Sequence, residues 1–216
     1  MCGRYTTEME TDERELFRIL ARAEENRYDP SVPRLSGDTS IAAIGGREVY
    51  PSDPAAVLLA DGTGTIDAVF CRWGFDAEIG AKRRLIINAR SEALEGRPMF
   101  APHFLSHRCI IPTAGFFEWA HTGMRADPNR KFRFNLPHTG LLYLAGLYRP
   151  TVDAEGREKL EFVILTRDAS DSMRPIHDRM PVIVRNEHIP EYLGDSTSAG
   201  RLLSETPPVL LKKLVS

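Results

Sequence analysis

Residues 108–120 read RCIIPTAGFFEWA, an apolar run of the kind that predicts β-strand. Short apolar or alternating runs of this type, separated by turn residues, recur along the chain at 55–60, 65–70, 84–88, 131–136, 141–148, 160–166 and 180–184. Few helical patterns interrupt them. We therefore expect an α+β fold: a single domain over 1–216 with a mixed, barrel-like β-sheet flanked by short helices.

The helical patterns are mostly short. Residues 6–26 predict an early helix, because Leu16, Ile19, Leu20 and Ala23 recur at helical spacing. Residues 91–107 predict one or two short helices between strands, and 187–205 two more near the end of the chain. A length of 216 residues is enough for one domain with a sizeable core.

The composition is that of an ordinary water-soluble protein, with 42% hydrophobic and 27% charged residues. The formal net charge of −2 does not indicate a strongly basic nucleic-acid binder, although a local patch of arginines can exist within a balanced total. No apolar leader and no run approaching the ~20 residues of a membrane span is present. We expect a cytoplasmic protein that does not contact the membrane.

Three cysteines are present, Cys2, Cys71 and Cys109. The number is odd and no CxxC pair indicates zinc or a redox couple, so we expect reduced thiols, no metal and no cofactor. Cys71 and Cys109 lie in apolar runs and are expected in the core. Cys2 would become the N-terminus if Met1 were removed.

Cys2 has two interpretations. It is either part of a loose chain start or a nucleophile with two reactive groups, the thiol and the free α-amine. The amine titrates near ~8 and the thiol near ~8.5, so both are partly nucleophilic at neutral pH. An N-terminal cysteine can form an imine with an aldehyde and then close it to a five-membered thiazolidine.

Asn88 and Arg90 follow an apolar strand in LIINARSEAL, residues 85–94. Asn at a strand end is most often a turn residue, but its amide can also donate and accept at once, which suits the orientation of an amine or thiol. Arg90 is either a surface charge or a clamp for a phosphate. The local pattern leaves both alternatives open.

Glu118 stands among aromatic residues in GFFEWA. In a strand, Phe117 and Trp119 share one face, and Phe116 and Glu118 the other. Burial would raise the pKa of the carboxyl and make it a proton shuttle near neutral pH. The alternative is an edge strand with Glu118 in water.

His177 lies in RPIHDRMPVIV, where Pro175 disfavours a helix and an apolar strand follows. The triplet His177-Asp178-Arg179 places a proton-transfer group beside a carboxylate and a cation. A single histidine is more often structural than catalytic. The dense polar setting at the start of a strand favours a functional role.

Taken together, four segments resemble one family. The segments MCGRYT (1–6), INARSEAL (87–94), RCIIPTAGFFEW (108–119) and PIHDRMPVIV (175–184) resemble the SOS-response-associated peptidase family, SRAP, whose members are understood as abasic-site processing proteins. The match is strongest over 2–184 and follows the family's order and rough spacing.

The resemblance implies a specific activity. Once Met1 is removed, Cys2 would attack the open-chain aldehyde of an abasic site in single-stranded DNA and form a thiazolidine DNA–protein cross-link that shields the lesion. Asn88 would position Cys2, Glu118 would act as acid and base, and His177 would help to open the sugar.

Further implications concern binding and side activities. Arg4, Arg90 and Arg179 would hold phosphates, and Trp119 could pack against the sugar or an adjoining base. An associated lyase activity, an N-terminal autopeptidase activity, a monomeric state and association with the nucleoid when bound to DNA are also expected.

Two stretches depart from the family pattern. Residues 49–55, VYPSDPA, lack the asparagine of the family's corresponding loop, and 73–84, WGFDAEIGAKRR, lack the tryptophans of its wedge loop. Two other functions remain open: an N-terminal-nucleophile hydrolase acting on an amide or ester, and a non-enzymatic nucleic-acid-binding module. Abasic DNA distinguishes them, because only the cross-linking activity gives a heat-stable adduct.

Overall fold

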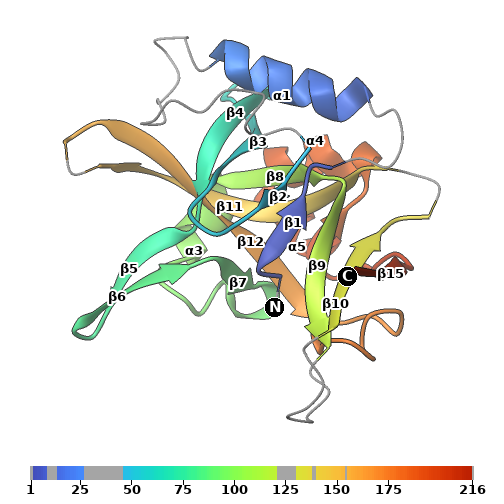
Figure 1. Ribbon diagram of the computed structural model, residues 1–216. Helices are drawn as coiled ribbons and strands as arrows, with labels where there is room; N and C mark the ends of the chain where they lie inside the picture. Colours follow the sequence, from blue (N-terminus) through green and yellow to red (C-terminus); the bar gives the residue numbers. More distant parts are fainter. Residues whose placement is uncertain are drawn as a thin grey trace.

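Five strands close into a barrel in the computed structural model, and an open sheet lies beside it (Figure 1). The structure describes residues 2–8, 14–26, 46–120, 130–137, 140–153 and 155–215. The barrel strands, in the order of their pairing, are β12 (Glu158–Asp168), β4 (Ile66–Trp73), β3 (Pro54–Ala60), β8 (Arg108–Thr113) and β11 (Leu142–Val152), which pairs with β12 again. The expected strands at 55–60, 65–70, 141–148 and 160–166 are confirmed.

Short strands extend the barrel at β12 and β11. β7 (Asn88–Arg90) and β13 (Arg179–Pro181) pair with β12, and β14 (Ile183–Val184) pairs with β11. β4 and β7 run parallel to β12, whereas the other pairs are antiparallel. The sheet is therefore mixed, and the expected α+β fold with a barrel-like sheet is confirmed.

The open sheet has the strand order β15 (Leu211–Val215), β10 (Arg130–Asn135), β9 (Gly115–Ala120), β1 (Arg4–Thr6) and β2 (Glu48–Val49). Residues 108–120 thus form two strands, since the chain leaves the barrel after Thr113 and enters the open sheet at Gly115. Thr113 Oγ1 and the Ala114 amide both donate to the Thr6 carbonyl, at 2.7 and 2.8 Å. A Cβ at Gly115 would lie 2.8 Å from the Phe134 carbonyl oxygen, so this crossing point favours glycine.

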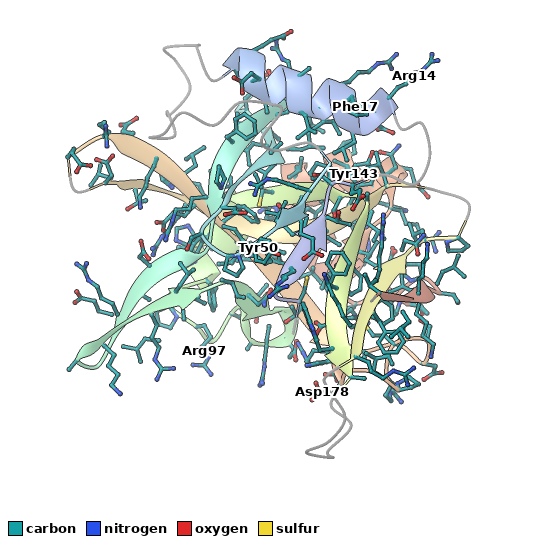
Figure 2. The ribbon with its side chains drawn as sticks, viewed as in Figure 1. Arg14, Phe17, Tyr50, Arg97, Tyr143 and Asp178 are labelled. Carbon is teal, nitrogen blue, oxygen red and sulfur yellow. The ribbon has the colours of Figure 1, made fainter. Side chains whose placement is uncertain are left out.

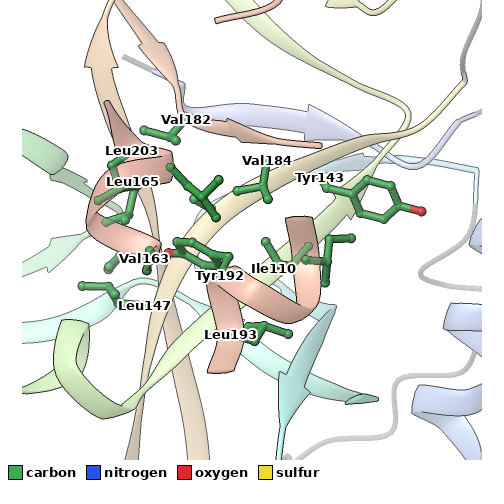
Figure 3. Close-up of a cluster of buried hydrophobic side chains, with 14 of the residues drawn as sticks. Ile110, Tyr143, Leu147, Val163, Leu165, Val182, Val184, Tyr192, Leu193 and Leu203 are labelled. Atoms are coloured by element: carbon green, nitrogen blue, oxygen red, sulfur yellow. The ribbon is translucent and has the colours of Figure 1, made fainter. Parts of the chain in front are cut away.

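Alternating side chains of the barrel strands enter two separate cores. Ile110 packs with the helix-facing cluster in Figure 3, whereas its neighbours Cys109 and Ile111 pack with the cluster that also contains Cys2 and Tyr5. Cys71 and Cys109 are fully buried, as expected. The barrel therefore carries the helices on one side and supports the N-terminus on the other.

The helices are α1 (Arg14–Asn26), α3 (Ala101–Ser106), α4 (Ile189–Gly194) and α5 (Ser196–Leu203), with 3-10 turns η1 (Ser91–Ala93) and η2 (Asn186–His188). The early helix is shorter than 6–26, because Thr6 lies in β1 and Thr7 and Glu8 are not helical; residues 9–13 lie outside the described part. Within the described residues, no helix is long and apolar enough to cross a membrane.

A two-stranded hairpin of β5 (Phe75–Ile79) and β6 (Lys82–Ile86) projects from the barrel (Figure 1). Ile79 near its tip is 49% exposed, and Lys82, Arg83 and Arg84 are also exposed.

Candidate active site

Cys2 lies two residues before the first residue of β1 and is fully buried. Its thiol approaches the Arg4 carbonyl at 3.6 Å, and Asn88 Nδ2 donates to the Cys2 carbonyl at 2.8 Å. Burial raises the pKa of the Cys2 thiol well above its usual range, and the nearby Glu118 carboxylate raises it further. Cys2 is therefore held in place, not part of a loose chain start, and its thiol needs a base to become a thiolate at neutral pH.

Asn88 reaches Cys2 because β7 pairs in parallel with β12, opposite Ile164. Its amide nitrogen is used by the Cys2 carbonyl, whereas its Oδ1 is buried and accepts no hydrogen bond from the described residues. A buried acceptor without a donor is costly unless a ligand or a changed chain end supplies one. The side chain that binds the Cys2 carbonyl through Nδ2 therefore also has an acceptor, Oδ1, that is available to a further donor at this site.

Glu118 lies on β9 between β1 and β10, so β9 is an interior strand and the edge-strand alternative is wrong. The residue is 2% exposed. Burial raises the pKa of its carboxyl from 4.5 to about 7, and the negative charge of Asp178 contributes in the same direction. A carboxyl with this pKa exchanges protons readily at neutral pH, as an acid–base catalyst must.

His177 lies between β12 and β13. Its Nδ1 accepts a hydrogen bond from the Arg179 amide at 2.9 Å and lies 2.8 Å from Asp178 Oδ1. A ring nitrogen that accepts carries no proton, so the neutral ring is protonated at Nε2. When the ring gains a second proton, Nδ1–H can donate to Asp178 instead.

Asp178 connects His177 to Glu118. Its charge contributes to the raised pKa of Glu118, and Figure 2 places it at the end of the molecule where β9 ends. From the sequence, Asp178 is only a neighbour of His177, with no role of its own. Its position in the triplet was the available signal, but nothing in the sequence connected it to Glu118.

With this geometry in view, comparison with known proteins gives a consistent result. The family model described as "SOS response associated peptidase (SRAP)" matches residues 1–211. The chain belongs to the SRAP family. It is 35% identical over 203 residues to "Abasic site processing protein YoqW" of Bacillus subtilis (strain 168), a match that covers 90% of this chain and 80% of the relative.

Other relatives and solved structures agree. "Abasic site processing protein YedK" of Escherichia coli (strain K12) is 29% identical over 205 residues, covering 95% of this chain and 84% of the relative. A crystal structure of a protein from Bacteroides thetaiotaomicron aligns with a TM-score of 0.72 at 18% identity, over 100% of this chain and 92% of that one. One from Bordetella bronchiseptica aligns at 0.69 and 21%, over 100% of both chains. At these identities the solved structures show a shared fold alone.

The four residues expected at the centre of an SRAP site occupy one end of the molecule. Asn88 donates a hydrogen bond to Cys2, and the Glu118 carboxylate raises the pKa of the Cys2 thiol. The pKa of Glu118 is in turn raised by the charge of Asp178, which directly follows His177 in the chain. Segments that are distant in sequence thus converge, through β1, β7, β9 and the approach to β13, on one reactive end.

The remaining expected site residues differ in their surroundings. Arg4 lies over two aromatic rings, 4.6 Å from the Tyr50 centroid and 5.0 Å from the Trp119 centroid, and 3.7 Å from Glu48. Trp119 is partly exposed, and Arg90 is exposed at the end of β7. Arg4, Arg90 and Trp119 are therefore accessible to a ligand.

Arg179 is 7% exposed and its guanidinium is surrounded by oxygen atoms. It forms ion pairs with Glu92 and Asp168, the latter at 2.5 Å, and donates to the Thr166 carbonyl at 2.9 Å. These bonds tie η1 to β12 and to the start of β13. The geometry supports a positioning role for Arg179 between the Asn88 and His177 segments, while phosphate binding by this residue remains a prediction.

Proposed function

We propose that this SRAP protein captures abasic sites in single-stranded DNA as a thiazolidine cross-link on Cys2, after removal of Met1. The observation that supports this most is the position of Cys2, buried at the chain start between the Asn88 amide and a carboxyl whose pKa is raised to about 7. The names of the curated relatives describe abasic-site processing, and the aldehyde of an abasic site is the electrophile that an N-terminal cysteine traps.

The reaction has four steps. The closed sugar opens when its ring oxygen gains a proton and its anomeric hydroxyl loses one, and this frees the aldehyde. The Cys2 amine adds to the aldehyde carbon to give a carbinolamine, which loses water to become an imine. The Cys2 sulfur then bonds to the imine carbon, while the thiol proton is transferred to the nitrogen, so that one water leaves overall.

Each proton transfer has a candidate group. Glu118 is suited to protonate the departing hydroxyl and to accept the thiol proton, because its pKa of about 7 lies near the working pH. His177, once both of its ring nitrogens carry a proton, is suited to give the Nε2 proton to the sugar ring oxygen and to return to the neutral ring. Asn88 Oδ1 is suited to accept a hydrogen bond from the newly formed Cys2 amine.

Processing and side reactions belong to the same proposal. Met1 removal, by an aminopeptidase or by the protein's own autopeptidase activity, frees the Cys2 amine for the reaction. The imine would also permit strand cleavage by a lyase reaction before the ring closes. We propose that a monomer binds the DNA, with Arg4, Arg90 and Arg179 on phosphates and Trp119 against the sugar or a base.

The test is incubation of the purified chain with single-stranded DNA that carries one abasic site. A heat-stable adduct on a denaturing gel is expected for the processed chain, and Cys2→Ala should form none while keeping its affinity for the DNA. Hydrolysis of an acyl substrate without adduct formation would support the N-terminal-nucleophile hydrolase instead. A complex that is lost in high salt, with no adduct, would support a simple binding module.

A further inference from the structure

The open sheet has two faces with different chemistry. Tyr5, Phe116 and Phe134 form one cross-strand row and are buried, so this face is the inner one. Because side chains alternate along a strand and paired residues share a face, the neighbouring rows lie on the other side. We call this side the outer face; it consists of Arg4, Thr6, Glu48, Gly115, Phe117, Trp119, Lys131, Arg133, Asn135, Leu211, Lys213 and Val215.

Positive charge is concentrated on the outer face. Its cations are Arg4, Lys131, Arg133 and Lys213. The single carboxylate on this face of the described strands is Glu48, which forms an ion pair with Lys131 and lies 3.7 Å from Arg4. The chain as a whole has a formal net charge of −2. The concentration of cations is therefore a local feature and matches the charge of a polyanion.

Aromatic rings lie beneath the cations. The Lys131 ammonium is 3.9 Å from the centroid of Phe117 and 5.8 Å from that of Trp119. Phe117 is 4% exposed, whereas Trp119 is partly exposed and Lys213 is exposed. Stacking rings and cations on one sheet face are the two components that single-stranded nucleic-acid surfaces combine.

The outer face begins at the reactive end. Arg4 lies two residues after Cys2 and points to the outer face, because it pairs with Phe117 and precedes the inward-pointing Tyr5. Trp119 directly follows the inward-pointing Glu118 and points to the outer face as well. Figure 1 places the N-terminus and the end of β9 at the same end of the molecule, with β10 and β15 beyond them. Adjacent strands lie about 4.8 Å apart, so β15 is roughly 14 Å from β1 across the sheet.

We propose that one flank of the single-stranded DNA leaves the lesion over Arg4 and Trp119 and continues across the outer face past Lys131 to Lys213. This inference rests on the proposed function and extends its binding surface from the reactive end to the sheet edge. The occupant is the phosphodiester backbone, held by charge and by base stacking on Trp119, without sequence preference.

The test uses the neighbouring lysines of β15. Lys213 lies on the outer face opposite Arg133, whereas Lys212 lies opposite Phe134 on the inner-face side, and both are exposed. Lys213→Glu and Lys212→Glu therefore change the charge equally at adjacent positions. Lys131→Gln adds a second outer-face variant that does not depend on the sheet edge.

Affinity is measured by fluorescence anisotropy with oligonucleotides that carry a tetrahydrofuran analogue of the abasic site, which has no aldehyde and forms no adduct. The arm on each side of the analogue is shortened in turn. Lys213→Glu and Lys131→Gln should weaken binding when one particular arm is long, and each should lower the salt slope by about 0.7. They should have no effect once that arm is trimmed, and Lys212→Glu should bind like the unchanged chain.

Equal weakening by Lys213→Glu and Lys212→Glu would overturn the proposal, as would an effect that persists after both arms are trimmed. The adduct assay with genuine abasic DNA tests the proposed function separately. Absence of an adduct together with the expected Lys213 and Lys212 contrast would refute the cross-linking chemistry and still support DNA binding on the outer face.

Discussion

Replacement of Glu118 by glutamine should make the folded protein more stable, and increasingly so as the pH rises. The carboxyl is 2% exposed, and its pKa rises on folding from 4.5 to about 7. Below about pH 4.5 the group is neutral in both states and costs nothing. As the pH rises toward 7, the unfolded chain loses this proton and the folded chain keeps it, so the free energy of unfolding falls.

The magnitude follows from the shift. One pKa unit corresponds to ~1.4 kcal/mol, so ionised Glu118 costs the folded state about 3 kcal/mol at pH 8 and less than about 1 kcal/mol at pH 5. Glutamine has nearly the same shape and no charge. The stability advantage of Glu118→Gln should therefore grow by about 2 kcal/mol between these two pH values.

The assay is urea unfolding at both pH values, followed by tryptophan fluorescence, to which the fully buried Trp73 contributes. Both chains are released from a fusion by a protease that cuts directly before Met1, because the position of the charged chain end affects the pKa of Glu118 and must be the same in both. Glu205→Gln, at an exposed position, is the control for the loss of one carboxylate. A constant difference between Glu118→Gln and the unchanged chain at both pH values would refute the reasoning.

Three further predictions follow from the site and the core. Arg179→Ala should lower the free energy of unfolding by about 1–3 kcal/mol, because it breaks a buried set of charged hydrogen bonds. Arg90→Ala, at an exposed position, should leave urea unfolding unchanged and weaken DNA binding. The reverse pattern would contradict these assignments. Gly146→Ala should lower the free energy of unfolding by about 1–3 kcal/mol, since its Cβ would lie 2.5 Å from a buried side chain. Gly96→Ala is the control, because a Cβ there meets nothing within 4 Å. Equal melting temperatures of the two variants would be inconsistent with this packing. His177→Ala should slow adduct formation and its reversal by part of the ~10²–10⁴ range typical of an acid–base group, with unchanged affinity for the tetrahydrofuran analogue; wild-type rates would leave His177 with a packing role only.

Much of the fold could be predicted from the sequence because its strands are short apolar runs bounded by turn residues. Residues 108–120 illustrate the limit. Their apolar pattern predicts strand throughout, yet the chain changes sheets at Ala114, where pairing with Thr6 forms the crossing. That pairing joins positions more than a hundred residues apart, so no local pattern indicates it.

The candidate site shows the same division between local and long-range information. The type of each residue at Cys2, Asn88, Glu118 and His177 indicated its chemistry, but burial decided between the alternatives. Glu118 is buried because β9 lies between β1 and β10, and Cys2 is buried although chain starts are usually exposed. Both facts depend on strand order, which the sequence alone did not determine.

Arg179 shows what a local motif does not indicate. The triplet His177-Asp178-Arg179 places the Arg179 cation beside a histidine and a carboxylate, but it does not indicate the distant partners of that cation. In the folded chain its guanidinium is paired with Glu92, which is 87 positions away. The charge of a residue can be read from the sequence, whereas its partners depend on the tertiary structure.

The central claim is that Cys2 reacts through both its thiol and its amine, and intact mass spectrometry tests it most directly. The chain that begins at Cys2 and the chain that retains Met1 are each incubated with the same abasic single-stranded DNA. We predict one product from the Cys2 chain, with the summed mass of protein and DNA less one water, and no heat-stable product whose mass still includes Met1. An adduct that still includes Met1 and forms as readily would contradict the claim.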